Sequence, residues 1–184
     1  YGWKYLGFGP TWSGGLMFAH CITANSEVYG NYVHQGWGEA IGVFTFSDVG
    51  SGGVDIYNNI VYSSRRVDIY IDGSSNNEVY NNVLIGTDDC VYKGVTILRP
   101  DGGCWNQVGI ALNAEDYDKT SVMDVANNKV YNNLIVGHLT GLEIGVGPNV
   151  QSYDNHTNNK IFNNTFLSNR YNMRADSGLA TLIT

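Results

Sequence analysis

The residues of this sequence that could do chemistry are carboxylates accompanied by a few cations. Two carboxylates that face one substrate can act as general acid and general base, which is the arrangement that glycoside hydrolysis uses. A Lys or Arg beside them could act as the base of a polysaccharide lyase and could neutralise an acidic sugar. We therefore predict a set of catalytic residues that could meet on one surface of the fold. Its members are Asp68, Asp88, Asp89, Glu143, Lys93 and Arg174.

Recognition of a sugar chain also needs aromatic rings and hydrogen-bonding side chains near those carboxylates. The sequence offers both kinds of side chain in the same segments, and the predicted substrate-binding residues are Arg65, Tyr70, Trp105, Asn113 and Tyr117. Hard oxygen ligands for a cation also lie in one short segment. These are Asp88, Asp89 and Asp101, which could hold Ca²⁺.

The elements that would position these side chains follow a repeated asparagine phrase. Asn makes up 22 of the 184 residues, and many Asn stand in pairs. The phrase reads Asn-Asn-Lys-Val-Tyr-Asn-Asn at residues 127–133 and Asn-Asn-Lys-Ile-Phe-Asn-Asn at residues 158–164. Its closing Asn recurs at 31, 59, 82, 133 and 164, in steps of 28, 23, 51 and 31 residues. Self-similarity at a period of about 20 to 30 residues indicates a solenoid of stacked coils.

A second short strand follows each phrase after about ten residues. Apolar residues alternate there with other residues, which is the period of a strand, and no sustained helical stripe occurs in the sequence. The two-residue turns that would join the hairpins of a β-sandwich are scarce. We predict an all-β solenoid of about six coils with loop insertions. The predicted second strands span residues 40–44, 67–71, 108–112 and 141–146, with weaker copies at 16–18 and 171–175.

The paired asparagines have a structural interpretation. Asn tolerates the left-handed backbone conformation, and its side chain both donates and accepts hydrogen bonds. If every coil bends at the same residue, Asn stacks above Asn. We expect the side chains at 31, 59, 82, 133 and 164 to form one hydrogen-bonded ladder. This interpretation removes most Asn residues from the candidates for a ligand site.

The phrase Asn-Lys-Val-Tyr-Asn-Asn, with Ile-Tyr-Ile-Asp-Gly-Ser-Ser-Asn at residues 69–76, resembles the right-handed parallel β-helix repeat of the pectate-lyase-like superfamily, in repeats of the NosD type. The resemblance covers the chain from roughly residue 13 to residue 176 and implies that fold. Members of the superfamily include polysaccharide lyases, glycoside hydrolases, epimerases, esterases, phage tailspikes and surface adhesins. The resemblance therefore implies a fold and leaves the function open.

A second, shorter resemblance concerns the paired aspartates. Thr-Asp-Asp-Cys-Val at residues 87–91 is similar to the paired-Asp motif of polygalacturonase-type hydrolases. Residues 137–138 and Arg174 stand where that family has Gly-His-Gly and Arg-Ile-Lys. The sequence departs from the family at residues 65–67, where Arg-Arg-Val replaces Asn-Thr-Asp. It also lacks the second Gly after residue 138 and the Lys after Arg174.

Alternation along the second strands predicts which residues face outward. If the isoleucines of the 67–71 strand point into the core, then Asp68, Tyr70 and Asp72 point out. Coils stack about 4.8 Å apart, so Asp68 and Glu143 would lie roughly 10 Å apart, near the upper limit for an inverting pair of carboxylates. Solvated surface carboxylates are the alternative interpretation. The residues expected to face outward on the later coils are Ala111, Asn113, Glu143, Asn172 and Arg174.

One long segment interrupts the rhythm of the coils. The phrase that closes at residue 82 is separated from the next strand at residue 108 by 26 positions, against 8 positions in the coil before. About 18 extra residues leave the coil, and we place this insertion at residues 87–105. Long insertions in repeat proteins are often binding loops. Cys90 and Cys104 could close the insertion with a disulfide, and two reduced core thiols are the alternative.

Charge and composition narrow the class of partner. The chain carries 10 Lys and Arg against 17 Asp and Glu, for a net charge of −7. Nucleic-acid binding needs cations that displace counterions from phosphates, so we predict no nucleic-acid partner. No apolar run approaches the roughly 20 residues that span a bilayer, so we predict no membrane span.

We expect residues 1–184 to form a single β-helix domain, as a fragment or a processed part of a longer solenoid. The predicted function is that of an extracellular, carbohydrate-active protein that binds or cleaves an acidic polysaccharide, as a lyase or a glycoside hydrolase. The alternative is a non-catalytic structural or adhesive solenoid, or a fibre subunit that associates end to end through exposed coil ends.

Overall fold

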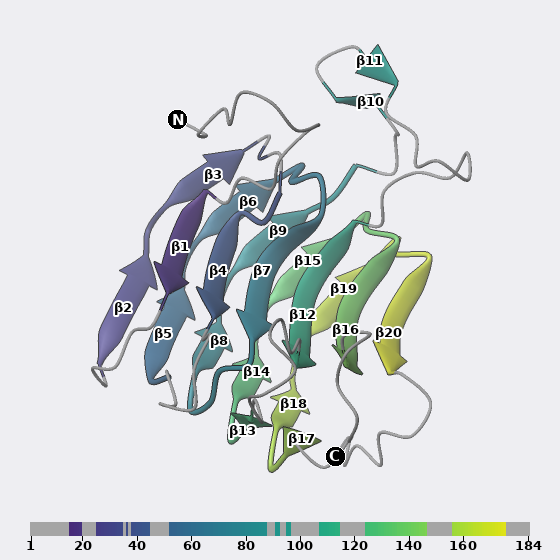
Figure 1. Ribbon diagram of the computed structural model, residues 1–184. Coiled ribbons are helices and arrows are strands. Elements are labelled where there is room, and N and C mark those ends of the chain that lie inside the picture. Colours follow the sequence, from purple (N-terminus) through teal and green to yellow (C-terminus); the bar gives the residue numbers. More distant parts are fainter. Residues whose placement is uncertain are drawn as a thin grey trace.

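The strands of the protein stack into a solenoid in a computed structural model of the chain (Figure 1). Each coil crosses three sheets, and successive coils follow a right-handed path. Within the described residues every strand pairing is parallel except one short hairpin. These features confirm the predicted right-handed parallel β-helix. The structure describes residues 15–19, 25–34, 36, 38–44, 52–87, 91–92, 95–96, 107–114, 124–146 and 156–175.

Sheet A has six strands and faces the viewer in Figure 1. It contains all four predicted second strands and both weaker copies, so that prediction is confirmed. The strands, in spatial order, are β1 (Leu16–Ala19), β4 (Ile41–Phe44), β7 (Val67–Asp72), β12 (Val108–Ala114), β16 (Thr140–Val146) and β20 (Tyr171–Ala175).

Sheets B and C are formed by each asparagine phrase together with the three residues that follow it, as two short strands on either side of the closing Asn. The third sheet was not predicted, because the sequence was interpreted with two strands in each coil. Sheet B contains β2 (Ser26–Tyr29), β5 (Val54–Tyr57), β8 (Glu78–Tyr80), β14 (Lys129–Tyr131) and β18 (Lys160–Phe162). Sheet C contains β3 (Tyr32–His34), β6 (Ile60–Tyr62), β9 (Val83–Ile85), β15 (Leu134–Val136) and β19 (Thr165–Leu167).

Two small strand pairs complete the described structure. β13 (Val125–Ala126) pairs in parallel with β17 (His156–Thr157). β10 (Val91–Tyr92) and β11 (Val95–Thr96) form an antiparallel hairpin inside the predicted insertion.

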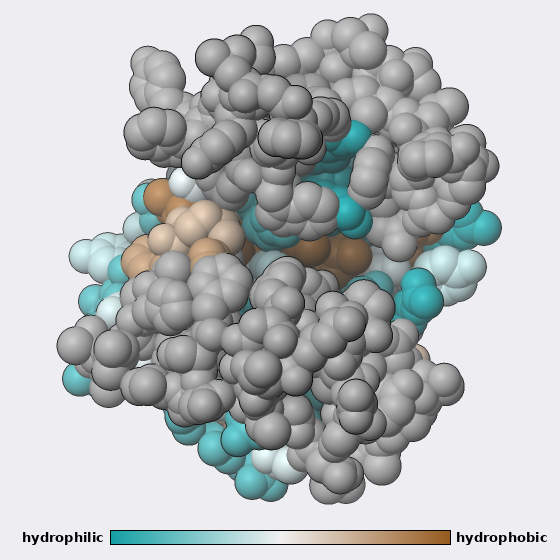
Figure 2. Space-filling view, viewed as in Figure 1, coloured by the Kyte–Doolittle hydropathy of each residue, from teal (hydrophilic) through white to brown (hydrophobic). Residues whose placement is uncertain are grey.

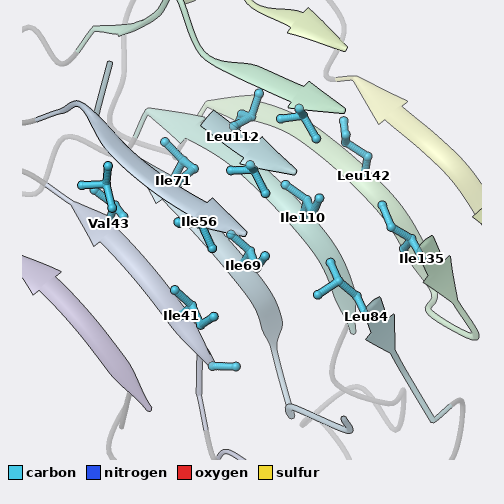
Figure 3. Packing of buried hydrophobic residues seen from close by; sticks show 14 of the residues in the cluster. Ile41, Val43, Ile56, Ile69, Ile71, Leu84, Ile110, Leu112, Ile135 and Leu142 are labelled. Atoms are coloured by element: carbon cyan, nitrogen blue, oxygen red, sulfur yellow. The ribbon is translucent and has the colours of Figure 1, made fainter. Parts of the chain in front are cut away.

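The core fills the inside of the tube with columns of similar side chains. In sheet A, Ile41, Ile69, Ile110 and Leu142 lie opposite one another in consecutive coils, and all four are fully buried. Figure 3 shows these side chains together with the isoleucines and leucines of the other two sheets, all pointing into the same interior. Full burial of one such side chain contributes about 1.5–3 kcal/mol, so the stacked columns are the main source of stability.

The predicted asparagine ladder is present at the bend between sheets B and C. The backbone N and Nδ2 of Asn59 both donate to Oδ1 of Asn82, each at 3.0 Å. Asn82 donates in the same way to Oδ1 of Asn133, at 3.0 and 2.9 Å. The residue before each ladder Asn adopts positive φ, for example 55° at Asn81. The two residues of each closing Asn pair therefore have different roles: the first adopts the left-handed conformation at the bend, and the second forms the hydrogen-bonded ladder.

A second ladder, which the sequence interpretation missed, runs along the bend before sheet B. Asn77 donates through its backbone N and Nδ2 to Oδ1 of Asn128, both at 2.9 Å. Asn128 donates likewise to Oδ1 of Asn159, at 3.0 and 3.1 Å. These residues belong to the opening Asn pairs of the phrases at 76–82, 127–133 and 158–164, so in these three phrases both pairs serve the fold.

The outer face of sheet B carries a continuous stack of aromatic rings. Neighbouring ring centroids lie 4.9–5.1 Å apart, with interplanar angles of 3–8°. The rings inside the stack are covered on both faces by their neighbours, so they stabilise the sheet and offer no free face to a sugar. The stacked residues are Tyr29, Tyr57, Tyr80, Tyr131 and Phe162. A charged row runs beside them and consists of Glu27, Asp55, Glu78, Lys129 and Lys160.

The outer face of sheet C has the opposite composition. Its five strands contain no Asp, Glu, Lys or Arg. Several of the outward side chains are well exposed, including Tyr32 at 64%, Ile60 at 45% and Leu167 at 50%. The outward columns are Tyr32, Ile60, Val83, Leu134 and Thr165 in one line, and His34, Tyr62, Ile85, Val136 and Leu167 in the other.

Candidate functional site

The outer face of sheet A is the candidate functional site, because most of the described residues that the sequence nominates lie on it. One column runs from Tyr70 through Ala111 and Glu143 to Arg174 in consecutive coils. Asn113 lies two residues further along β12, in the neighbouring column. This register confirms the predicted alignment of the coils. Figure 2 views the molecule from this side, where a band of described atoms crosses the middle of the face with apolar and polar residues intermixed.

The middle coils of this face form a packed apolar cluster. Tyr70, Val108 and Ala111 are 7%, 4% and 1% exposed, and Val67 packs against them. Tyr70 was predicted to bind substrate, but its ring is a member of this cluster. The accessible part of the face therefore lies elsewhere along the column.

The last two coils provide that accessible part. Glu143 on β16 lies directly opposite Arg174 on β20. Tyr171, at the start of β20, is 50% exposed, and the guanidinium carbon of Arg170 lies 5.6 Å from the centre of its ring. A cation over a ring face is an attractive contact that also orients both groups. These four residues place a carboxylate, an aromatic ring and a guanidinium group on adjacent strands, with a second guanidinium group directly before β20.

Arginine is confined to sheet A and its approaches among the described residues. The Arg-Arg pair at residues 65–66 directly precedes β7, Arg170 directly precedes β20, and Arg174 lies within β20. The described lysines, Lys129 and Lys160, lie instead on sheet B. Arg presents a planar fork of donors that matches carboxylate groups, whereas Lys is a point charge. The described guanidinium groups therefore gather on and beside sheet A, where the carboxylates of Asp72 and Glu143 also lie.

Arg170 and Tyr171 were not among the predicted site residues. Strict alternation gave no signal for Tyr171, because it assigns Asn172 and Arg174 to the outer face and leaves Tyr171, at the register of Val67, on the inner one. The cation–π contact could not be read from the sequence, since it depends on the rotamers of both side chains.

The prediction that Asp68 points outward is wrong. Its side chain is buried, and its carboxylate Oδ2 lies 2.7 Å from Nε2 of His138, which is also buried. At the same register on the next coil, a Cβ on Gly109 would touch the side chain of Ile135, which is a core residue. This position therefore faces the interior, and a carboxylate there cannot reach a polymer outside the solenoid.

The cause is a local break in the alternation of β7. Val67 packs on the outer cluster, yet the next two residues, Asp68 and Ile69, are both buried. A rule of strict alternation cannot anticipate such a step. The sequence did hold one signal, because Gly109 and Gly141 occupy the register of Asp68 on the following coils. Successive glycines at one register leave room for the side chain of a neighbour.

His138, the partner of Asp68, lies at the bend between sheets C and A. Its ring lies against Gly86, where an added Cβ would approach Cδ2 of His138 to 2.8 Å. The backbone N of His138 donates to Oδ1 of Asn169 at 2.9 Å, and Nδ2 of Asn169 donates to the carbonyl of Ile135 at 3.0 Å. The Asp68–His138 pair is therefore a buried structural contact. It joins residues 70 positions apart, which is why no local motif revealed it.

Two further predicted residues lie on the approaches to the face. Asn113 is half-buried, and no donor to its Oδ1 is present among the described residues. Its carbonyl accepts a hydrogen bond from the backbone N of Gly73 at 2.9 Å. The backbone N of Arg65 donates to the carbonyl of Gly36 at 3.0 Å, which holds the Arg-Arg pair at the corner before β7.

The insertion leaves the solenoid through a narrow base. The backbone N of Thr87 donates to Oε1 of Gln107 at 2.9 Å, so the two ends of the insertion are held together. The hydroxyl of Thr87 also bonds that of Ser63 on the preceding coil, at 2.9 Å. The predicted residues that lie outside the described part of the structure are Asp88, Asp89, Cys90, Lys93, Asp101, Cys104, Trp105 and Tyr117.

The charged groups of sheet B perturb one another along the row. Burial raises the pKa of Asp55, and the negative charges of Glu78 and Glu27 raise it further. The hydrogen bond from Lys129 lowers the pKa of Glu78. Burial and the hydrogen bond that its hydroxyl donates to Glu78 raise the pKa of Tyr131 to about 12. These shifts come from neighbours along one ladder, so they mark packing of the sheet.

The described residues contain neither a metal site nor a membrane-spanning helix. Among them, no group of three or more His, Cys, Asp or Glu side chains could hold a metal ion, and the predicted Ca²⁺ ligands lie outside this part of the chain. The described residues also contain no helix that is long and apolar enough to cross a membrane.

Comparison of the chain with protein-family models, curated proteins and solved structures finds no match. The parallel β-helix is visible in the strand register itself. The resemblance to the pectate-lyase-like superfamily remains a prediction from the repeated phrase.

Proposed function

We propose that the protein binds an acidic polysaccharide along the outer face of sheet A, with the last two coils as the recognition end. The gathering of arginine on this sheet carries the proposal, because guanidinium groups pair with the carboxylates of acidic sugars in a planar, two-point contact. Tyr171 adds an exposed ring beside Arg170 and Arg174. A sugar ring can pack on such a surface while its acidic group meets an arginine.

The repeating geometry of the face supports a polymer as the ligand. Strands of the sheet repeat about every 4.8 Å, so a chain of repeating units can meet equivalent positions on consecutive coils. The resemblance of the asparagine phrase to a superfamily that includes polysaccharide lyases and hydrolases points in the same direction. We place the protein outside the cell for the same reasons.

We propose binding as the primary activity, with cleavage as an extension of it. Glu143 is the carboxylate on the exposed part of the face, and a hydrolase or lyase needs a second acid or base. Asp88, Asp89 and Lys93 of the insertion are the residues that would supply it.

The test is a binding titration of the chain with polygalacturonate, with neutral dextran as the control polymer. We expect Arg174→Ala to weaken binding about tenfold or more, since a charge-assisted hydrogen bond contributes about 1.5–3 kcal/mol. Lys160→Ala removes one positive charge from sheet B and should leave binding unchanged. Equal affinity of the wild type and the Arg174 variant, or equal losses in both variants, would contradict the proposal. Unsaturated products or new reducing ends in the same mixture would extend it to cleavage.

A second candidate function is self-stacking of coils end to end, and the polarity of the ladders favours it. Each ladder Asn donates to the Asn of the next coil, so the first described coil presents Oδ1 of Asn31 and the last presents the backbone N of Asn164. Within the described residues neither group has a partner in that role. The charged row of sheet B is also polar along the solenoid, because it begins with the acidic Glu27 on the first coil and ends with the basic Lys160 on the last.

Charge exchange tests this second candidate. If coil ends meet, Lys160 of one molecule lies beside Glu27 of the next, as Lys129 lies beside Glu78 within the chain. Lys160→Glu and Glu27→Lys should each reduce light scattering by concentrated protein, and the double variant should restore it. No change in scattering with any of the three variants would remove this candidate.

A further inference from the structure

We infer that the outer face of sheet C is an interface with a second copy of this chain, in which two such faces pack against each other. The face presents ten outward side chains in two straight columns on five strands. Its strands carry no Asp, Glu, Lys or Arg. Six of the ten side chains are exposed and the four at the centre are half-buried, so the face is a contiguous and largely apolar surface of the kind that marks an interaction site.

The chemistry of the face excludes the ligand proposed for sheet A. Sugar recognition needs hydrogen-bonding side chains, yet the centre of the face consists of Val83, Ile85, Leu134 and Val136. An anionic membrane surface is also disfavoured, because the chain has a net charge of −7 and the strands of this face have no Lys or Arg to offset it. The occupant that we propose is therefore an apolar protein surface.

A second copy offers the matching surface, because the side chains of the face change in size from one end to the other. Aromatic rings lie on the first two coils, at Tyr32, His34 and Tyr62. The fifth coil has Thr165 and Leu167 in the same columns. A two-fold axis through the third coil would place the large rings of one copy over the smaller side chains of the other. Large-on-small packing of this kind is how β-sheets pack face to face, about 10 Å apart.

The charges of the molecule do not oppose this contact. The charged row lies on sheet B, and the described arginines lie on or beside sheet A. Face-to-face packing of sheet C therefore leaves both sets of charged side chains outside the interface. Repulsion between two acidic chains is then reduced by distance and by salt.

The size of the face sets the expected strength of the dimer. A standard interface buries roughly 800 Å² and about 20–30 residues on each side. Ten residues on each side amount to half of that or less. We therefore expect a reversible dimer with a dissociation constant in the range of about 1 to 100 µM.

The experiment is sedimentation velocity of the full chain over about 1 to 200 µM, a range that brackets the expected dissociation constant. The wild type should shift with concentration from 20.2 kDa to twice that mass. In the two-fold arrangement Ile60 of one copy lies over Leu134 of the other, so Ile60→Lys should weaken the dimer at least tenfold. A monomer over the whole range would overturn the inference.

A mixing experiment tests the geometry itself. Ile60→Lys and Leu134→Glu should each be monomeric alone, and an equimolar mixture should form a heterodimer, because the new lysine of one copy meets the new glutamate of the other. Circular dichroism and thermal unfolding check that each variant folds. Failure of the mixture to associate, with both variants folded, would overturn the two-fold arrangement.

A matched pair of variants separates this face from its neighbour if the central variants fail to fold. Tyr32 and Tyr29 lie three residues apart on sheets C and B and are 64% and 57% exposed. Tyr32→Lys should weaken the dimer, and Tyr29→Lys should not. Equal effects of the two variants would overturn the inference. So would association that responds to Lys160→Glu and not to Tyr32→Lys, or binding of monomeric protein to neutral lipid vesicles through this face.

Discussion

Sheets B and C are built from the same phrases, with strands of similar length in the same coils, yet their outer faces differ in almost every respect. Sheet B carries a stack of five rings beside a charged row, and each ring inside the stack has both faces covered by its neighbours. Sheet C presents aliphatic and aromatic side chains with no charged residue in any strand. The outward side chains of one sheet can therefore contact mainly one another along the solenoid, as on sheet B. On another sheet they can remain available to a partner, as on sheet C.

The largest effect should come from the bend that both sheets share. Asn82 accepts two hydrogen bonds from Asn59 and donates to Asn133 and to the carbonyl of Ile56. Asn82→Ala would leave several buried groups unsatisfied, so we expect the free energy of unfolding to fall by about 3 kcal/mol or more. Urea unfolding measures this change.

The residue beside it supplies the control for this prediction. Asn81 has a φ of 55° and lies at the exposed left-handed position. Asn81→Gly should change stability by less than about 1 kcal/mol, because Gly adopts this conformation without strain. Similar losses in both variants would show that the two residues of the pair do not divide their tasks as described.

The next effect distinguishes the two faces directly. Tyr80 stacks on Tyr57 and Tyr131, so Tyr80→Ala removes two ring contacts and should cost about 2 kcal/mol. Ile85 lies on the sheet C strand of the same coil and is half-buried, so Ile85→Ala should cost about 1 kcal/mol or less in dilute protein. Thermal unfolding of both variants at low concentration provides the comparison, and equal losses would contradict the view that sheet B saturates its own contacts.

Alkaline pH should loosen sheet B. The folded state raises the pKa of Tyr131 to about 12, above the usual value of 10, so folding favours the protonated hydroxyl. The stability from this group is fully present below pH 10 and is lost as the pH rises from about 10 to about 12. Ultraviolet titration of tyrosinate in the wild type and in Tyr131→Phe should show one late-ionising group missing from the variant. Identical curves above pH 11 would contradict this assignment.

The smallest effect concerns the acidic end of the charged row. Asp55 lies between Glu27 and Glu78, and burial and these two charges raise its pKa. A raised pKa of an acid means that its ionised form weakens the fold at neutral pH, so Asp55→Asn should stabilise the protein by a few tenths of a kcal/mol at pH 7. The gain should disappear below pH 4, where Asp55 itself is protonated. A loss of stability at pH 7 would show that Lys129 outweighs the two acidic neighbours.

The features that recur with a clear pattern in every coil, namely the asparagine bend and most of sheet A, could be predicted from the sequence. Sheet C could not. The closing Asn of each phrase identified the bend and the ladder, and alternation identified most of sheet A. Sheet C was missed because Val-Leu-Ile at residues 83–85 and Leu-Ile-Val at residues 134–136 are apolar throughout, so alternation gives no signal there. Only the structure shows that Leu84 and Ile135 point inward and that their neighbours are the outer face.

The candidate site was predictable to a smaller extent. The column that contains Glu143 and Arg174 follows from aligning the strands, and the structure confirms it. Asp68 was misplaced because its direction depends on a partner, His138, that is 70 residues away. Burial of Tyr70 likewise depends on packing with Val108 and Ala111 on the next coil, which no local pattern encodes.

The narrow base at Thr87 and Gln107 has a consequence for how this molecule can change. The hydrogen bond between these two residues closes the coil, and β9 and β12 continue the stack on either side of it. The path of the coil at this corner therefore does not depend on the length of the insertion. Segments of different size and chemistry can be exchanged above this corner in evolution or by grafting, while the coils beneath keep their register. The rigid repeat and the variable loop are separable parts, and a new specificity can be acquired without building a new fold.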